Sequence, residues 1–506
     1  MTGATEGASQ VPEVVRPEAA GPTLTVRGAT FLGIGSMIGA GIFALLGEAG
    51  AVAGAAVWIS FLIGGIVAML LGYVCVKLGS RYPSSGGLTT YLIEGYGRGR
   101  LVGVASWLGY IAAIVIVTAM VAVSFGGYAT SLFVGDNASA AWDNVFITAL
   151  LIAMVIVNLV GTKIVEIAQS LIVSGVLVVF GIFIWVTIFD IDLDKLAFSG
   201  YPSVSKIIAS VALTFFAYLG FNVITFAAGD LRDPKRDLPR AMYGALSVTS
   251  LIYVLIALGV FGTLTVAEVI GYGETAIAEA ARPALGDAGF TVMAVAALLS
   301  TAGATNATLY ASSNLTGMLA QEGLFPSFFG AGSRLGAKAG LFITAGLVLI
   351  VANLVDLSAI ASVGSAVALM IFVLVGVAGY RRRTDTGSNT AIVALAITVT
   401  AAVLGFFAVD TWRTAPQTFT AIIAILILAV ILDVWTRGRA HRPPLQPASG
   451  GPRAAHTAAP APISRRRGRR RMKPKEEAEL LAPAMGRPWK RGLSFATRPC
   501  AILRVT

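Results

Sequence analysis

The residues of this chain that are best placed to do chemistry are glycines, because they can expose the backbone itself. Four of them fall within nine positions of the first long apolar run: Gly33, Gly35, Gly39 and Gly41. Glycines that only let helices pack closely recur at four-residue spacing on one face, whereas these alternate around the helix and predict a broken one. The amides of Gly39, Ala40 and Gly41 would then lie at a helix N-terminus, where they can hold an anion.

A second apolar run carries a similar interruption. Gly220 stands near its middle, flanked by Tyr218 and Asn222. A break here would free carbonyl oxygens and amides that no helical hydrogen bond satisfies. The two predicted breaks are 180 residues apart, counted from Ala40 to Gly220.

Composition identifies the elements that must position these breaks. The chain has 506 residues, of which 56% are hydrophobic and only 12% charged, with a mean hydropathy of +0.81. Soluble proteins carry about 25% charged residues, and a membrane-spanning helix uses about 20 apolar residues. The chain is therefore predicted to be an all-α integral membrane protein with about twelve spans.

The predicted spans follow twelve apolar runs: 30–50, 53–79, 100–132, 143–161, 164–189, 204–229, 240–263, 287–319, 339–355, 357–380, 390–408 and 415–435. The stretch 84–97 is too polar to span and is predicted to be re-entrant or interfacial. The loop 264–286 is predicted to form a short helix over the entrance. Broken helices five spans apart, entered from opposite sides, indicate an inverted-repeat transporter with a site at the middle of the membrane.

Charge predicts the orientation. From Thr436 onward the chain has 17 Lys and Arg against three acids, so the net charge of +11 belongs to the tail. Before the tail, sixteen Lys and Arg lie in segments on one side of the predicted spans and four on the other. The positive-inside rule then puts both termini in the cytoplasm. No secretory signal pattern is present in the first 27 residues.

Several classes of site are excluded from the membrane body. Both histidines, His441 and His456, lie in the tail, so no His-based metal site or triad is expected in the spans. The cysteines, Cys75 and Cys500, form no metal or redox motif. The phosphate-binding sequence of ATP-driven pumps is absent. We therefore expect no enzyme, no metal, no cofactor and no nucleic-acid partner.

Three motifs resemble the amino acid–polyamine–organocation superfamily of permeases: GIGSMIGAGIF, FFAYLGFNVITFAAGDLRDPKRDLPRAM and TNATLYASSNLTGMLAQEGLFP. The resemblance covers residues 25–435. It implies the five-plus-five inverted repeat of the leucine transporter, with helices 1 and 6 broken and two further C-terminal helices. The corresponding domains are a disordered N-terminus at 1–27, a transporter domain at 28–435 (repeats 28–189 and 204–380, extra helices 390–435) and a basic, disordered tail at 436–506.

The resemblance also implies a substrate site for an amino acid zwitterion. The amides at Gly39, Ala40 and Gly41 would hold its carboxylate. Carbonyls would hold its ammonium group, at Met37, Ile38, Phe216, Ala217 and Leu219, and Phe216 would act as an aromatic gate. Tyr218 and Asn222 adjoin the second break. Further candidates are Phe215, Phe221, Tyr110 and Ile114 for the side-chain pocket, and Ser358, Ser362 and Ser365 for the pathway, although packing and Ser back-bonding remain alternative explanations.

The expected charge of the substrate rests on the absence of charged residues from the middle of the predicted spans. No acid or base is identified at midplane depth, whereas a cationic substrate calls for a buried acid. Related sequences often have an acid at the places of Asn222 and Gly229. Neutral amino acids are therefore favoured, and cationic amino acids or polyamines are the alternative. The alternative function is a transporter-like sensor that signals through the tail, although the tail has no recognisable folded domain.

The sequence does not decide which ion, if any, is coupled to transport. Several proton-coupled relatives have a lysine in the fifth span, and Val176 stands at its place, next to Ser174 and Gly175. Sodium held near Ser300, Thr301 and Thr305, exchange or facilitated flux, and a proton carried elsewhere remain possible. The oligomeric state is open as well. The basic cluster SRRRGRRRMKPK is interpreted as a solvated tail, with binding of anionic lipid as the alternative.

Overall fold

The computed structural model describes residues 24–84, 86–135, 139, 141–160, 163–329 and 338–439, without the side chains of 40, 163–170 and 439. This part of the chain is helical throughout and has no named strand; a single bridge joins Leu24 and Leu231. The predicted disorder of residues 1–27 and 436–506 falls almost entirely outside the described residues. The predicted domain boundaries remain predictions.

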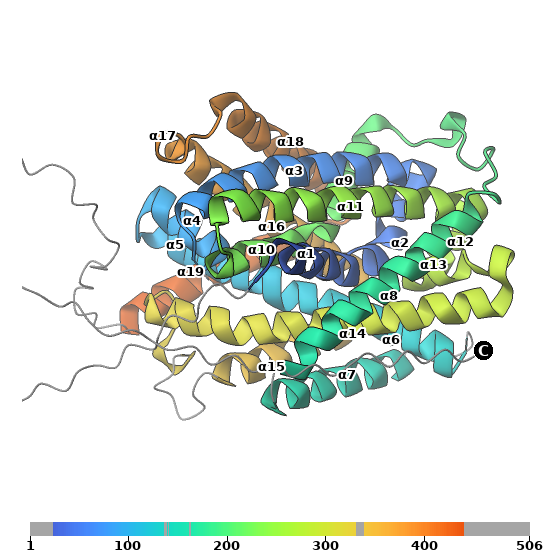
Figure 1. Ribbon diagram of the computed structural model, residues 1–506, viewed down its shortest axis with the longest axis horizontal. Coiled ribbons are helices and arrows are strands. Elements are labelled where there is room, and N and C mark those ends of the chain that lie inside the picture. Colours follow the sequence, from blue (N-terminus) through green and yellow to red (C-terminus); the bar gives the residue numbers. More distant parts are fainter. Residues whose placement is uncertain are drawn as a thin grey trace, which may run out of the picture. The chain divides into compact units, whose positions relative to one another are not determined.

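Long apolar helices lie roughly side by side and form the body (Figure 1). In chain order the main helices are α1 (Val26–Ala40), α2 (Ile42–Ala53), α3 (Val57–Arg81), α5 (Arg100–Tyr110), α6 (Val117–Phe133), α7 (Ala141–Val160), α8 (Lys163–Thr187), α9 (Val204–Ala217), α10 (Asn222–Phe226), α11 (Pro234–Thr263), α14 (Arg282–Gln321), α15 (Ala339–Leu354), α16 (Leu357–Arg381), α18 (Thr390–Thr414) and α19 (Pro416–Arg439). Among the described residues, nine helical segments are long and apolar enough to cross a membrane.

Short elements gather at the two ends of the bundle. At one end, called here the α4 end, lie α4 (Gly87–Tyr96) and α17 (Arg383–Thr386). At the other end lies the segment 264–281, which we call the lid (Figure 1). It consists of α12 (Val266–Tyr272), η6 (Gly273–Thr275) and α13 (Ala276–Glu279). The short helix expected in the loop 264–286 is present. The stretch 84–97 contains α4, and its predicted re-entrant or interfacial place in the membrane remains a prediction.

Local sequence signals account for several helix boundaries. The Asp233 side chain caps α11, and Pro234 follows at its first position, where no backbone N–H is needed. Thr265 and Glu268 form a capping box that starts α12. Gly54, with φ of 55°, ends α2 in a conformation that favours glycine, so α2 and α3 are separate helices.

The first helix is broken at one point only. α1 runs without interruption through Gly33, Gly35 and Gly39 and ends at Ala40, and α2 begins directly after Gly41. The prediction that all four glycines mark irregular backbone is therefore wrong for three of them. A Cβ on Gly33 would collide with Ile224, and one on Gly39 would lie 2.6 Å from the carbonyl oxygen of Ser300. These two glycines serve close helix packing, as small residues commonly do in membranes.

Candidate substrate site at the two helix breaks

The first break requires glycine because other backbone comes very close to it. A Cβ on Gly41 would lie 2.5 Å from the carbonyl oxygen of Ala217 and 2.7 Å from that of Met37. Real Cβ atoms do not approach other atoms this closely. Gly41 has a φ of −108°, which any residue can adopt. The need for glycine therefore comes from space and not from backbone strain.

The second break lies directly against the first. α9 ends at Ala217, and a short 3-10 turn, η4 (Leu219–Phe221), leads into α10. A Cβ on Gly220 would collide with the backbone nitrogen of Met37. The two unwound stretches, far apart in the sequence, therefore touch backbone to backbone, and the backbone groups of both can reach one ligand.

Tyr253 of α11 ties the breaks together. Its hydroxyl lies 2.6 Å from the carbonyl oxygen of Met37 and 3.3 Å from that of Ala217, and it donates to both. The side chain is fully buried. Sequence analysis did not select this residue, because a tyrosine inside an apolar helix carries no local sign of its partners. Two of the five carbonyls assigned to an ammonium group are thus shared with a tyrosine hydroxyl, and each has a second lone pair to offer.

A small cavity of about 40 Å³ lies beside the second break and has room for a few water molecules. Leu219, Asn222 and Phe226 line it from η4 and α10, and Tyr110 lines it from α5. The Oδ1 atom of Asn222 is buried and has no hydrogen-bond partner among the described residues. No Asp, Glu, Lys or Arg is among the residues that line the cavity. The polar side chains that line it are therefore uncharged.

The aromatic candidates divide by what they contact. Phe216 is buried, and a Cβ on Gly364 of α16 would collide with its ring, so the ring covers that glycine. Phe215 and Phe221 both contact Phe372, at ring-centroid distances of 5.6 and 5.3 Å. These two rings join α9 and η4 to α16 and act as packing residues.

Two other candidates have their polar groups engaged elsewhere. The Tyr218 hydroxyl donates to the carbonyl oxygen of Phe61 in α3, 3.0 Å away. The Ser365 hydroxyl donates to the carbonyl oxygen of Ala361 in its own helix, 2.6 Å away. Ser365 is thus a case of the helix back-bonding weighed from the sequence.

Tyr110 lies directly before an irregular stretch, and Ile114 lies within it. Residues Ile111–Ile116 form a π-helical segment between α5 and α6, a feature that is frequent at functional sites. The Tyr110 hydroxyl pairs with Thr344 of α15 at 2.8 Å. Its ring also meets Phe325 edge-on, and Phe325 stacks on Trp107 at 3.8 Å. This aromatic cluster closes the cavity region toward α14 and α15.

The region assigned to a coupling ion lies across from the first break. The Ser300 carbonyl is in close contact with Gly39, so α14 packs directly on α1. The Thr301 hydroxyl donates to Ala297 in its own helix, 2.7 Å away. The Thr305 hydroxyl is buried without a partner among the described residues. Val176, which the resemblance places at the position of the lysine of proton-coupled relatives, is 3% exposed.

Within the described residues, no group of three or more His, Cys, Asp or Glu side chains could hold a metal ion. The arrangement at the breaks offers backbone carbonyls, backbone amides and neutral hydroxyl or amide groups. Such a set suits a small molecule with both a positive and a negative group, because each can be bound by dipoles alone.

Comparison with known proteins is consistent with this geometry. Residues 24–434 match a family model described as amino acid permease. The inner membrane transport protein YbaT of Escherichia coli strain K12 is 31% identical over 401 residues, which is 79% of this chain and 93% of that protein. The serine/threonine exchanger SteT of Bacillus subtilis is 29% identical over 54% of this chain and 62% of its own length. The Asc-type amino acid transporter 1 of Mus musculus is 29% identical over 58% of this chain and 57% of its own length. The resemblance carried by the three sequence motifs is confirmed.

Proposed function

The chain belongs to the amino acid permease family, and we propose that it is a secondary transporter of neutral amino acids that works by alternating access. Its relatives are named as transporters, and its apolar helices make it a multi-pass membrane protein. The observation that supports the proposal best is the convergence of the two breaks. The Met37 and Ala217 carbonyls lie within reach of one hydroxyl.

The substrate would be held by backbone groups. The amide of Gly41, in front of α2, would bind the carboxylate, and the helix dipole of α2 would add to it. Gly39 and Ala40 form the end of α1, so the expectation that their amides lie at a helix N-terminus is wrong. The carbonyls of the two breaks would bind the ammonium group. Tyr253 would keep the Met37 and Ala217 carbonyls aimed at a common point, so that little reorganisation is needed on binding.

Neutral substrates are supported by the lining of the cavity. A cationic side chain left without a carboxylate partner would lose its hydration and gain only dipoles in return. Asn222 offers an uncharged oxygen instead. We therefore place cationic amino acids and polyamines second, as substrates that an acid at position 222 would favour.

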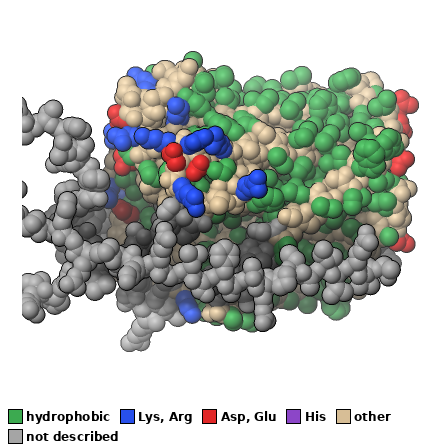
Figure 2. Space-filling view, in the orientation of Figure 1, with side chains coloured by type: hydrophobic (Ala, Val, Ile, Leu, Met, Phe, Trp, Pro, Cys, Tyr) green, Lys and Arg blue, Asp and Glu red, His purple; other side chains and the backbone are tan. Residues whose placement is uncertain are grey.

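The membrane arrangement that we propose has twelve spans, a five-plus-five inverted repeat and both termini in the cytoplasm. Figure 2 shows Lys and Arg side chains gathered at the α4 end of the face in view, whereas the charged side chains seen at the opposite end are acidic. The positive-inside rule then makes the α4 end cytoplasmic and the lid end external. The membrane would be the cell membrane, with lipid as the surroundings of the exposed apolar helix faces.

The test is uptake of a panel of radiolabelled amino acids into proteoliposomes, under separately imposed proton and sodium gradients. Accumulation or exchange of neutral amino acids supports the proposal. Transport restricted to lysine, arginine or polyamines would contradict the neutral assignment. Binding with no flux of any amino acid under these gradients or with internal substrate would favour a sensor.

A further inference from the structure

The lid rests on two glycines of the bundle. A Cβ on Gly47 of α2 would lie 2.7 Å from the carbonyl oxygen of Gly273. A Cβ on Gly127 of α6 would collide with Oε1 of Glu274. A larger residue at Gly47 would displace the backbone of η6, and one at Gly127 would displace the Glu274 side chain. The seat is therefore shaped for this segment, and the carboxyl group of Glu274 lies inside it.

The charged groups that act most strongly on Glu274 do not stabilise its ionised form. The two that act on it most strongly are acids, Asp143 at the start of α7 and Glu48 in α2. From α6 it is faced by Tyr128, whose hydroxyl is fully buried without a partner in the described part of the chain. A second buried hydroxyl, that of Ser124, lacks a partner one turn deeper in α6.

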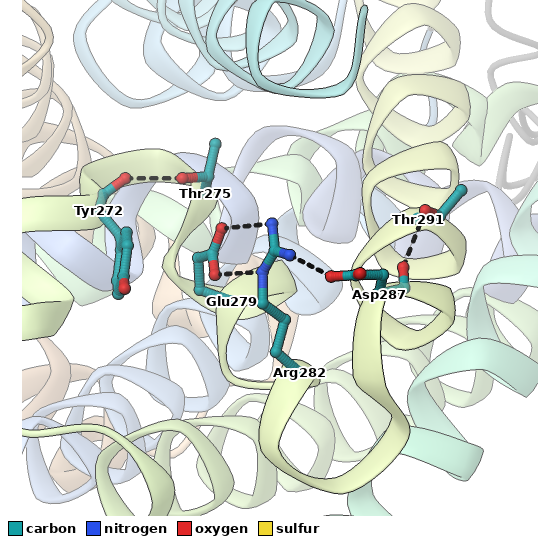
Figure 3. A network of polar contacts seen from close by, with 6 residues as sticks. All are labelled: Tyr272, Thr275, Glu279, Arg282, Asp287 and Thr291. Atoms are coloured by element: carbon teal, nitrogen blue, oxygen red, sulfur yellow. Dashed lines mark hydrogen bonds and ion pairs between the residues drawn. The ribbon is translucent and has the colours of Figure 1, made fainter. Parts of the chain in front are cut away.

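The remaining titratable groups of the lid are occupied or exposed. On α13, Glu279 pairs with Arg282 at 2.7 Å, and Arg282 also pairs with Asp287, as Figure 3 shows. On α12, Glu268 is tied to the Thr265 backbone in the capping box, and Tyr272 is exposed. The nearest arginine of the lid region thus already serves two carboxylates.

Burial raises the pKa of Glu274 from an ordinary 4.5 to about 7. A hydrogen bond with its own backbone lowers this pKa, and the negative charges of Asp143 and Glu48 raise it; the value of about 7 includes all of these effects. The charged form is therefore disfavoured in the seat.

We propose that the lid docks onto α2 and α6 with the Glu274 carboxyl protonated, and that loss of this proton releases the lid and opens this end of the molecule. The inference rests on the proposed function, since a gate has a purpose only in a transporter. The proton binds and leaves on the same side of the membrane. It therefore sets how often this end opens and supplies no driving force for uptake.

The pH window follows from the two states of the lid. Released, Glu274 has an ordinary pKa near 4.5, and docked it has a pKa of about 7. Below the lower value both states hold the proton, and docking is at its strongest. Between the two values docking takes up a proton, so each pH unit weakens it by up to about tenfold. Above pH 7 both states are ionised, and the weakening is complete.

The experiment measures access to the space beneath the lid. Ser124→Cys is introduced into a chain in which Cys75→Ala and Cys500→Ser remove the native thiols. The purified protein is reacted with a charged methanethiosulfonate reagent at about pH 5.5, 6.5, 7.5 and 8.5. The rate is compared with that of the same chain carrying Glu274→Gln, which keeps the shape of the side chain and removes its charge. Thiol ionisation affects both chains alike and cancels in the ratio of the two rates.

We expect the labelling rate of the parent chain, divided by that of the Glu274→Gln chain, to rise at least about tenfold between pH 5.5 and 7.5 and then to level off. A matched control replaces the other lid glutamate, Glu268→Gln, since glutamine preserves a capping box. The labelling rate of the parent chain, divided by that of the Glu268→Gln chain, should stay within about twofold at all four pH values. A Glu274→Gln ratio that does not change with pH would overturn the proposal.

A second labelling position is available in case the Ser124→Cys chain does not fold. Thr130→Cys, whose hydroxyl is also buried without a partner among the described residues, replaces Ser124→Cys if that chain does not insert. No substrate is present in the labelling reaction. A pH-dependent ratio in a protein that moves no amino acid would refute the proposed function alone, and a flat ratio in an active transporter would refute the lid mechanism alone.

Discussion

The Tyr253 hydroxyl lies 2.6 Å from the carbonyl oxygen of Met37, although the two residues are 216 positions apart in the sequence. This bond joins α11 to the end of α1. Because the same hydroxyl also reaches Ala217, one side chain fixes the spacing of the two helix breaks. The candidate site depends on that spacing, since a zwitterion must find carbonyls from both breaks at once.

Tyr253→Phe is expected to weaken substrate binding more than it weakens the fold. Removal of a buried hydrogen bond typically costs about 1 to 2 kcal/mol, so the melting temperature should fall by only a few degrees. The apparent KM for the transported amino acid should rise about tenfold as the carbonyls lose their common orientation. Uptake kinetics and thermal unfolding in detergent measure the two effects.

Tyr243→Phe is the matched control for this change. Tyr243 belongs to the same helix, ten positions before Tyr253, whose hydroxyl is the one that bonds the Met37 and Ala217 carbonyls. Removal of the Tyr243 hydroxyl should leave KM within about twofold. An unchanged KM in Tyr253→Phe would show that the tie does not shape the site.

Gly41→Ala is expected to reduce transport by tenfold or more, and Gly41→Val to abolish it. The added methyl would lie 2.5 Å from the Ala217 oxygen, so the breaks must separate to accommodate it. Gly405→Ala in α18 is the control, because a Cβ there meets nothing within 4 Å. Unchanged substrate affinity in Gly41→Val would move the binding site elsewhere.

Asn222→Asp is expected to change selectivity in favour of cationic amino acids. Its Oδ1 atom is buried beside the cavity without a partner among the described residues, so an aspartate would leave a charge that needs a cation. Lysine or arginine uptake should rise relative to uptake of neutral amino acids, measured by competition in proteoliposomes. Asn353→Asp, in α15 and outside the cavity lining, should not alter the ratio. A similar change in both variants would contradict the assignment.

Deletion of the chain after Arg439 is expected to leave transport within a few-fold of the full-length protein, because no candidate site residue is removed. A deletion after Leu432 should be more harmful. It removes Asp433 and Arg437, which pair at 2.8 Å, and it breaks the bond from Arg437 to the Gly99 carbonyl in front of α5. If the chain that ends at Arg439 inserts normally but does not transport, the tail has a mechanistic role.

An inward proton gradient in the absence of sodium is expected to drive no uphill uptake. The resemblance places Val176, which is buried, at the position of the lysine of proton-coupled relatives, so we expect that proton site to be missing. Exchange or facilitated flux is our first expectation, followed by sodium coupling near Ser300, Thr301 and Thr305. Accumulation that collapses with a protonophore would refute this prediction.

Local sequence was sufficient to predict the helices and the two regions that contain a break. Apolar runs of about 20 residues can satisfy their backbone in a membrane only as helices. Clustered glycines mark a region where a helix can break, although α1 continues through three of the four in the first cluster. The break at Gly41, the break around Gly220 and a short helix in the loop 264–286 were all predicted on these local grounds. The family motifs are local too, which is why the resemblance was recognisable.

Tertiary structure alone decided which groups meet at the breaks. Every residue has a carbonyl, so nothing in the sequence marks the Met37 oxygen as the partner of Tyr253. In the same way, Gly33 and Gly39 looked like sites of broken helix until their neighbours, Ile224 and Ser300, were known. Local sequence reports what a segment can form. Contacts between segments depend on the packing of helices that lie hundreds of residues apart, and a single chain read in order carries no direct signal of that packing.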